Sequence, residues 1–123
     1  MKKYRYTNTD CFKVGEEVWV TGFKLYPSGR VKYSVMPFLC RISEIKDRYI
    51  TLESTPSYYC PTNYYLDSPE NNGSYYDECS LNKNIAKTKE EAIENYNSRV
   101  IQEIEIKYQQ FRNIEASLKS RLL

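Results

Sequence analysis

The longest amphipathic pattern in the chain covers residues 88–122 and predicts one continuous helix. Thr88 can cap its start by accepting a hydrogen bond from the Glu91 amide, while the Glu91 side chain reaches back to the Thr88 amide. Apolar residues then recur at heptad spacing, with three more widening the stripe on one side: Ile93, Val100, Ile104, Phe111, Ile114 and Leu118, then Ile101, Tyr108 and Leu122. Neither Gly nor Pro interrupts the pattern, so we expect an unbroken helix.

Such a helix is too long for the rest of the chain to cover. At 1.5 Å per residue it would be roughly 50 Å long, whereas a compact domain made from residues 1–87 has a radius of gyration of about 12 Å. Much of the stripe therefore needs a second chain, and we expect the protein to be at least a dimer. The alternative is a helix that packs wholly on its own domain or breaks near Gln109 and Gln110.

Alternation of apolar and polar residues earlier in the chain predicts strands. The first is expected within residues 12–20, where Gly15 makes a turn and the pattern then has a period of two. Val14, Val18 and Val20 should face the core. Trp19 should cover the other face or an interface.

Two hairpins follow from turn chemistry. A turn at residues 26–29 contains Pro and Gly and should return the chain as a strand over residues 30–35. Residues 39–45 and 49–53 both alternate, and residues 46–48 connect them as a hairpin. Four or five short antiparallel strands followed by one terminal helix predict an α+β domain, whose sheet can curl like a small barrel.

The chain reads as a single domain, 1–123, with a β-rich core over 1–87 and a C-terminal helix over 88–123. Residues 55–80 are a polar excursion from that core, too long for an ordinary connector. It carries three tyrosine pairs: Tyr58 with Tyr59, Tyr64 with Tyr65, and Tyr75 with Tyr76. An ordered hairpin across residues 67–73 would explain the excursion structurally. The functional alternative is a stacking or partner-binding surface, because tyrosine is a rigid amphipathic contact residue.

Charge is distributed unevenly along the chain. Residues 1–48 hold ten basic and five acidic side chains, residues 49–82 hold none and five, and residues 83–123 hold eight and six. The basic first third suits a phosphate-bearing partner, unless the acidic segment simply folds against it. Neither a secretory signal pattern nor a run of 18 apolar residues is present, so we expect a cytoplasmic protein that does not span a membrane.

The residue types favour a binding protein over an enzyme. The chain has no histidine, and the common phosphate-binding and catalytic motifs are missing. The four cysteines, Cys11, Cys40, Cys60 and Cys79, lack the CxxC pairing of zinc sites. We therefore expect free thiols, mostly buried, with neither metal nor cofactor.

Arginine, tyrosine and asparagine side chains could together hold a nucleotide. Asn95 and Arg99 share one face of the predicted helix, whereas Arg112 lies about 25 Å from Asn95 along the axis. These groups cannot meet within one chain. If two helices cross antiparallel near Ile104, Arg112 of one chain comes within about a turn of Asn95 of the other, and two-fold symmetry makes the site twice. The alternative is that all three lie on solvated helix faces.

This combination resembles the phage Thoeris anti-defence sponges, which sequester cyclic ADP-ribose isomers. The resemblance rests on a β-rich N-terminal part that opens with FKVGEEV at residues 12–18. An apolar residue, TKEEA at residues 88–92 and a long C-terminal helix then follow. The resemblance implies a non-enzymatic phage protein, acting in the host cytoplasm, that forms an oligomer built from dimers with nucleotide pockets between subunits.

Carried over by position, the resemblance implies that Ile85, Asn95 and Arg112 line the pocket. Ile85 stands where the family pattern has an aromatic ring that stacks on adenine, which leaves one of the tyrosines as an alternative base contact. Arg30, beside the expected turn, is a further candidate for binding the pyrophosphate, and Arg99 shares the face of Asn95.

The favoured function is thus sequestration of a cyclic nucleotide immune signal at pockets between subunits. Two alternatives stay open. One is a protein-binding inhibitor or adaptor that uses the Tyr-rich residues 55–80. The other, less favoured, is a small β-barrel that binds nucleic acid through the basic first third and exposed tyrosines.

Overall fold

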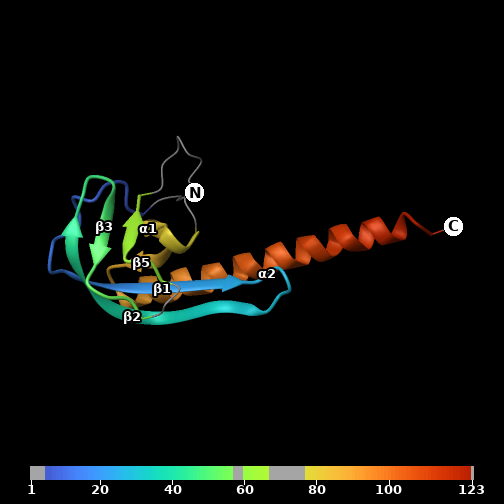
Figure 1. The fold of residues 1–123 in the computed structure, drawn as a ribbon, viewed down its shortest axis with the longest axis horizontal. Coiled ribbons are helices and arrows are strands. Elements are labelled where there is room, and N and C mark those ends of the chain that lie inside the picture. The colour runs from blue at the N-terminus through green and yellow to red at the C-terminus, as the bar shows by residue number, and fades with distance from the viewer. Residues whose placement is uncertain (1–4, 57–59, 67–76, 123) are drawn as a thin grey trace.

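A five-stranded antiparallel sheet lies at one end of the molecule, and a long helix runs across it and projects beyond it (Figure 1). This computed structural model describes residues 5–56, 60–66 and 77–122. The architecture is α+β, as the sequence predicts. The sheet is open, because its strands follow the order β4-β3-β2-β1-β5 without closing into a barrel.

The helices and strands are short except for β1, β2 and the last helix. In chain order they are β1 (Glu17–Leu25), β2 (Val31–Ile45), β3 (Tyr49–Leu52), β4 (Asn63–Tyr65), the 3₁₀ turn η2 (Asp77–Cys79), α1 (Leu81–Asn84), β5 (Ile85–Ala86) and α2 (Lys89–Lys119).

The turn between β1 and β2 forms as predicted. The amide of Tyr26 donates to the carbonyl oxygen of Arg30 at 2.8 Å, and Gly29 takes a φ of 94°, which favours glycine. The expectation of two separate strands over 30–35 and 39–45 is wrong, because β2 runs through both. An extra residue in β2 opposite Thr21 makes a bulge, which bends the strand without ending it.

The β2–β3 hairpin is also confirmed, with Ile45 paired to Ile50. Strands β4 and β5 escape prediction because two or three residues are too few to show alternation. Of the three tyrosine pairs, Tyr64 and Tyr65 lie in β4. The other two pairs and the hairpin expected across residues 67–73 lie outside the described residues.

Val18 and Val20 are fully buried in the core, as expected. Val14 is 66% exposed, and its predicted core position is wrong because β1 begins only at Glu17, after a turn at Gly15. The core otherwise gathers apolar side chains from all five strands, α1 and the N-terminal segment: Tyr6, Phe12, Cys40, Ile42, Ile50, Leu52, Tyr64, Leu66, Leu81 and Ile85.

Helix α2 starts at the predicted cap, where the Glu91 amide donates to the Thr88 hydroxyl at 3.1 Å. It is continuous through Gln109 and Gln110, and its 31 residues span about 46 Å. The Glu91 side chain was predicted to accept a hydrogen bond from the Thr88 amide. In the structure its carboxylate accepts from the Tyr6 hydroxyl instead.

Only the first half of α2 packs on the domain. Its buried residues are Ala92, Arg99 and Glu103. From Ile104 to Leu122 every residue is exposed except the half-buried Lys107. The helix therefore extends beyond its own domain, as its length predicts, while dimerisation stays a prediction.

Candidate functional site

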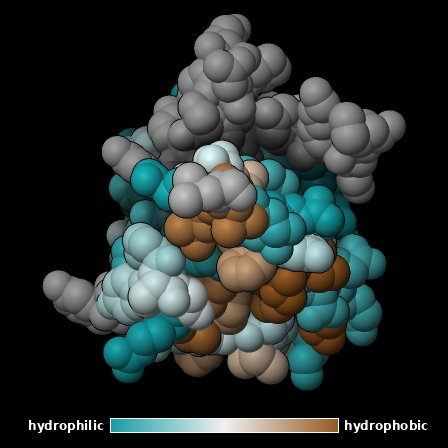
Figure 2. Space-filling view, turned by 90° about the vertical axis from the view of Figure 1, so that its right-hand side faces the viewer, coloured by the Kyte–Doolittle hydropathy of each residue, from teal (hydrophilic) through white to brown (hydrophobic). Residues whose placement is uncertain are grey.

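The apolar stripe of α2 lies beside the helix face that packs on the domain, and its side chains stay exposed. Ile104 is 57% exposed, Phe111 61% and Leu118 60%. With 100° per residue, these side chains point roughly 100° around the helix from the buried Ala92 and Glu103. Figure 2 looks onto the end from which α2 projects, and it shows apolar side chains gathered around that end. This stripe is the largest apolar surface of α2 that its own domain leaves uncovered.

A different set of residues attaches α2 to the sheet. Within the described residues, β1 pairs with β5 only at Trp19 and Val20, and beyond Val20 that edge of β1 is covered by α2. The Arg99 guanidinium donates to the carbonyl oxygen of Phe23 at 3.0 Å, and the amide of Leu25 donates to the Glu103 carboxylate at 2.9 Å. Two charged side chains, 3% and 2% exposed, thus satisfy backbone groups of an edge strand. Arg99, a candidate ligand residue, has this structural role.

Asn95 belongs to the same buried seam. Four residues of a helix and two residues of a strand both span about 6 to 7 Å. Arg99 lies beside Phe23 and Glu103 beside Leu25. Asn95, one turn before Arg99, is therefore level with Thr21, two residues before Phe23. The Asn95 Nδ2 and Thr21 Oγ1 atoms are buried and have no hydrogen-bond partner within the described part of the chain. Asn95 therefore keeps an unused donor, close to where α2 meets the sheet.

Arg112 lies in the projecting half of α2. Its guanidinium stacks over the ring of Tyr108, one turn earlier, at 4.9 Å from the ring centroid. Both side chains are exposed. The pair presents a cation that can bind phosphate beside an aromatic face that can stack on a base. Arg112 was predicted as a ligand residue, whereas Tyr108 was expected only as part of the apolar stripe, although the i,i+4 spacing of the two is visible in the sequence.

The other two candidates lie elsewhere. Ile85 is fully buried in β5, paired with Val20, and the core accounts for it without a ligand. Arg30 is exposed at the β1–β2 turn. That turn follows the β1 segment that Glu103 binds, so Arg30 lies on the side of the domain from which α2 projects. One chain brings together only Asn95 and Arg99, and leaves Arg112 about 25 Å from Asn95.

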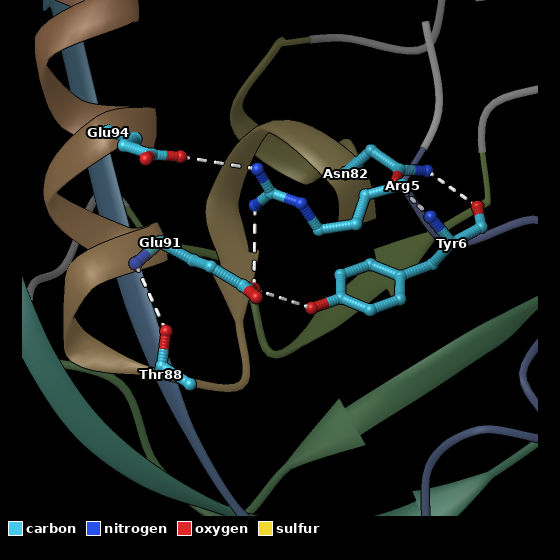
Figure 3. Close-up of polar contacts among 6 residues, drawn as sticks. All are labelled: Arg5, Tyr6, Asn82, Thr88, Glu91 and Glu94. Carbon is cyan, nitrogen blue, oxygen red and sulfur yellow. Dashed lines mark hydrogen bonds and ion pairs between the residues drawn. The ribbon is translucent and has the colours of Figure 1, made fainter. Parts of the chain in front are cut away.

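A polar cluster, which the sequence did not predict, joins the N-terminal segment to the start of α2 (Figure 3). The Tyr6 hydroxyl donates to Glu91 at 2.9 Å, and Arg5 contacts both Glu91 and Glu94 at 3.4 Å. The Tyr6 backbone also exchanges two hydrogen bonds with the Asn82 side chain. Burial, reinforced by the bond to Glu91, raises the pKa of Tyr6 well above its ordinary range. The cluster ties the N-terminal segment to the first turns of α2.

The four cysteines are free thiols in different environments. Only Cys40 is buried, Cys60 and Cys79 are half-buried, and Cys11 is exposed, so the expectation that most are buried is wrong. Burial, with a smaller contribution from Cys60, raises the pKa of the Cys40 thiol to about 11. Cys40 is therefore a neutral core residue at physiological pH.

One chain does not provide a ready-made ligand site. The described residues of a single copy enclose no pocket. Across the same ranges, no group of three or more acidic, Cys or His side chains is placed to hold a metal ion. Nor does any helix described here have the length and apolarity needed to cross a membrane.

Comparisons with protein-family models, with curated proteins and with solved structures find no match for this chain. The geometry of α2 and the chemistry of its side chains are therefore what indicate a function.

Proposed function

We propose that this protein is a non-enzymatic binding protein that sequesters a cyclic nucleotide immune signal at sites formed between two copies of the chain. The class of ligand is a cyclic ADP-ribose isomer, as the resemblance to the phage Thoeris anti-defence sponges implies. One observation carries the proposal: the residues with nucleotide-binding chemistry lie on both sides of the point where α2 leaves its domain. A single chain does not gather them.

Self-association is the first requirement. An exposed stripe of large apolar side chains at heptad spacing favours pairing with another helix, since burying each Ile, Leu or Phe contributes about 1.5 to 3 kcal/mol. Two antiparallel helices that cross near Ile104 place Arg112 of one copy close to Asn95 of the other. The interface is isologous, so each dimer has two such sites.

Ligand chemistry is the second requirement. A cyclic ADP-ribose isomer carries an adenine, two riboses and a pyrophosphate. Arg112 supplies a permanent positive charge for phosphate oxygens, Tyr108 beside it supplies an aromatic face, and the unused Asn95 amide supplies a donor. The Asn95 donor is covered within one chain and lies about 160° around the helix from the stripe residue Ile93, so a ligand reaches it only if the side chains that cover it move.

The test is ligand binding to the purified full chain. Thermal shift against cyclic ADP-ribose isomers, cyclic oligonucleotides and linear nucleotides identifies the ligand, because a molecule that binds only the folded state raises its melting temperature. Calorimetry then compares Arg112→Ala with wild type. Loss of one charge-assisted hydrogen bond should weaken binding by a factor of roughly 10 to 150.

Two controls separate binding loss from damage to the fold. Arg48→Ala removes an exposed arginine in the β2–β3 turn and should leave affinity unchanged. The mass and melting temperature of Arg112→Ala should match wild type. The proposal fails if no cyclic nucleotide binds, or if the ligand is recovered hydrolysed after the protein is denatured.

A further inference from the structure

We propose that the projecting end of α2 docks on a second copy of this chain in a specific place: antiparallel to the partner's α2 and against the outer face of the partner's β2 around Met36 and Leu39. This inference rests on the self-association proposed above. It names the surface that the partner helix occupies.

The outer face of β2 carries exposed apolar side chains on the α2 side of the sheet. Met36 is 64% exposed and Leu39 43%. Leu39 is paired with Trp19, over which the Lys89 amine lies at 5.9 Å, so both side chains face α2. Ser34, two residues before Met36, contacts the Tyr96 hydroxyl at 2.6 Å.

The stripe of α2 is turned towards this face of β2. Around the helix, Tyr96 lies between the buried side and the stripe residues Ile93 and Val100, about 40° from Ala92. Because Tyr96 contacts β2 through Ser34, the neighbouring stripe lies on the β2 side of α2. The helix and the strand therefore present one apolar surface, which we call the α2–β2 surface: Ile93, Val100, Met36 and Leu39.

Charge selects the antiparallel orientation. The start of α2, residues 89–94, carries one lysine and three glutamates, and it stays acidic even with Arg5 counted. The end, residues 112–121, carries three basic residues and one glutamate. An antiparallel partner brings the basic end beside the acidic start at both ends of the interface, whereas a parallel partner brings like charges together.

Length makes a second copy the fitting occupant. The free part of α2, residues 104–119, is about 22 Å long, and the distance from Ile104 back to Lys89 on the helix is also about 22 Å. A specific dimer uses about 20 to 30 residues from each side, more than the helix stripe alone supplies. Contacts from β2 add the missing part.

The crossing point predicts which residues meet. Met36 lies opposite Thr21, which is level with Asn95, and Leu39 is level with Lys89. In an antiparallel pair that crosses near Ile104, Asn95 and Lys89 are level with residues of the partner's helix that lie equally far beyond Ile104. Those are about residues 113 and 119. Met36 should therefore contact Ile114 of the partner, and Leu39 should contact Leu118 of the partner.

Photo-crosslinking tests this arrangement directly. Leu118 is replaced by the photoreactive residue benzoylphenylalanine in the full chain, and isotopically light and heavy proteins are mixed so that only intermolecular products are read. We expect the main cross-link to join position 118 to the segment containing residues 36–39 of the other copy. Cross-links between position 118 and the end of the partner's α2 would show parallel pairing and overturn the inference.

A paired set of variants gives a second readout. Met36→Glu combined with Leu39→Glu should raise the dimer dissociation constant by at least about tenfold, because each copy loses apolar contacts and gains buried charge. Val14→Glu changes an equally exposed valine outside the α2–β2 surface and should leave it unchanged. An unchanged dissociation constant for the double variant refutes docking on β2 while self-association through α2 stands. A monomeric wild type refutes self-association itself, and with it the proposed function.

Discussion

The two halves of α2 follow the same apolar pattern but have different surroundings. From Ala92 to Glu103 the helix lies on the sheet, and its buried side chains, Ala92, Arg99 and Glu103, are small or charged. From Ile104 onwards the helix extends beyond the described part of the domain, and its large apolar side chains stay exposed. The difference shows that the stripe is not the surface by which α2 attaches to its own domain.

The packed half is held by buried hydrogen bonds and by an edge contact between the Tyr96 and Phe23 rings, rather than by the apolar stripe. Arg99 and Glu103 bind the free edge of β1, a role more often filled by another strand. This leaves the stripe available along the whole helix. A helix that was made only to cover its own sheet would place Ile and Leu, not Arg and Glu, against it.

The strongest way to break the packed half is to remove Arg99. Arg99→Met deletes the bond to Phe23 and leaves that carbonyl oxygen at the β1 edge without its buried donor, which should cost about 1 to 3 kcal/mol. Folded domains of this size have only about 5 to 15 kcal/mol of stability. Urea denaturation should show the loss, whereas Arg112→Met in the projecting half should change the unfolding free energy by less than about 0.5 kcal/mol. Equal stability of the two variants would contradict the role given to Arg99.

The projecting half should respond in the opposite way. Ile104→Asp combined with Phe111→Asp places charge in the stripe and should give a monomer or an aggregate, because an unpaired charge is costly to bury. The domain itself should stay folded by circular dichroism. Light scattering measures the mass, and a wild-type mass of one chain at micromolar concentration would contradict the dimer.

The sequence predicted the elements of α2 better than its contacts. The Thr88 cap, the uninterrupted register and the excess length are local properties that a pattern records directly. The pattern does not show which face of the helix packs on the domain, because heptad spacing is the same whether the stripe meets its own sheet or a second chain. Arg99 was assigned to a ligand site for the same reason: a single arginine on a helix gives no sign that a strand edge will bury it.

The sheet shows the same limit. The first hairpin turn was predicted from Pro and Gly, and the second from the alternation on both sides of residues 46–48. Val14 was placed in the core because its apolar side chain comes shortly before the alternating residues, although the strand starts only at Glu17, after the turn at Gly15. The bulge opposite Thr21 depends on pairing between strands, which one strand's sequence does not show.

A smaller effect compares the two ends of α2. Thr88→Ala removes the hydroxyl that caps the packed half and should lower the unfolding free energy by about 1 kcal/mol. Ser120→Ala removes a hydroxyl that donates to the Ser117 carbonyl at the other end, where the last turn can fray alone. Its effect on urea denaturation should be close to zero. A larger loss at Ser120 than at Thr88 would mean that the projecting end is folded cooperatively with the domain.

The smallest effect concerns Cys40 and the pH dependence of the packed domain. Its pKa is raised to about 11 in the folded protein, against about 8.5 in an unfolded chain. The stability that follows from keeping this thiol neutral is therefore fully present below about pH 8.5 and is lost as the pH rises towards 11.

At pH 8 a thiol reagent should modify Cys11 quickly and Cys40 only on unfolding, because the reactive form is the thiolate and the Cys40 side chain is buried. Mass spectrometry of the labelled protein reads both sites. Rapid labelling of Cys40 in the folded state would show that the sheet opens locally beside α2, and the contrast between a fixed domain and a free helix end would then need revision.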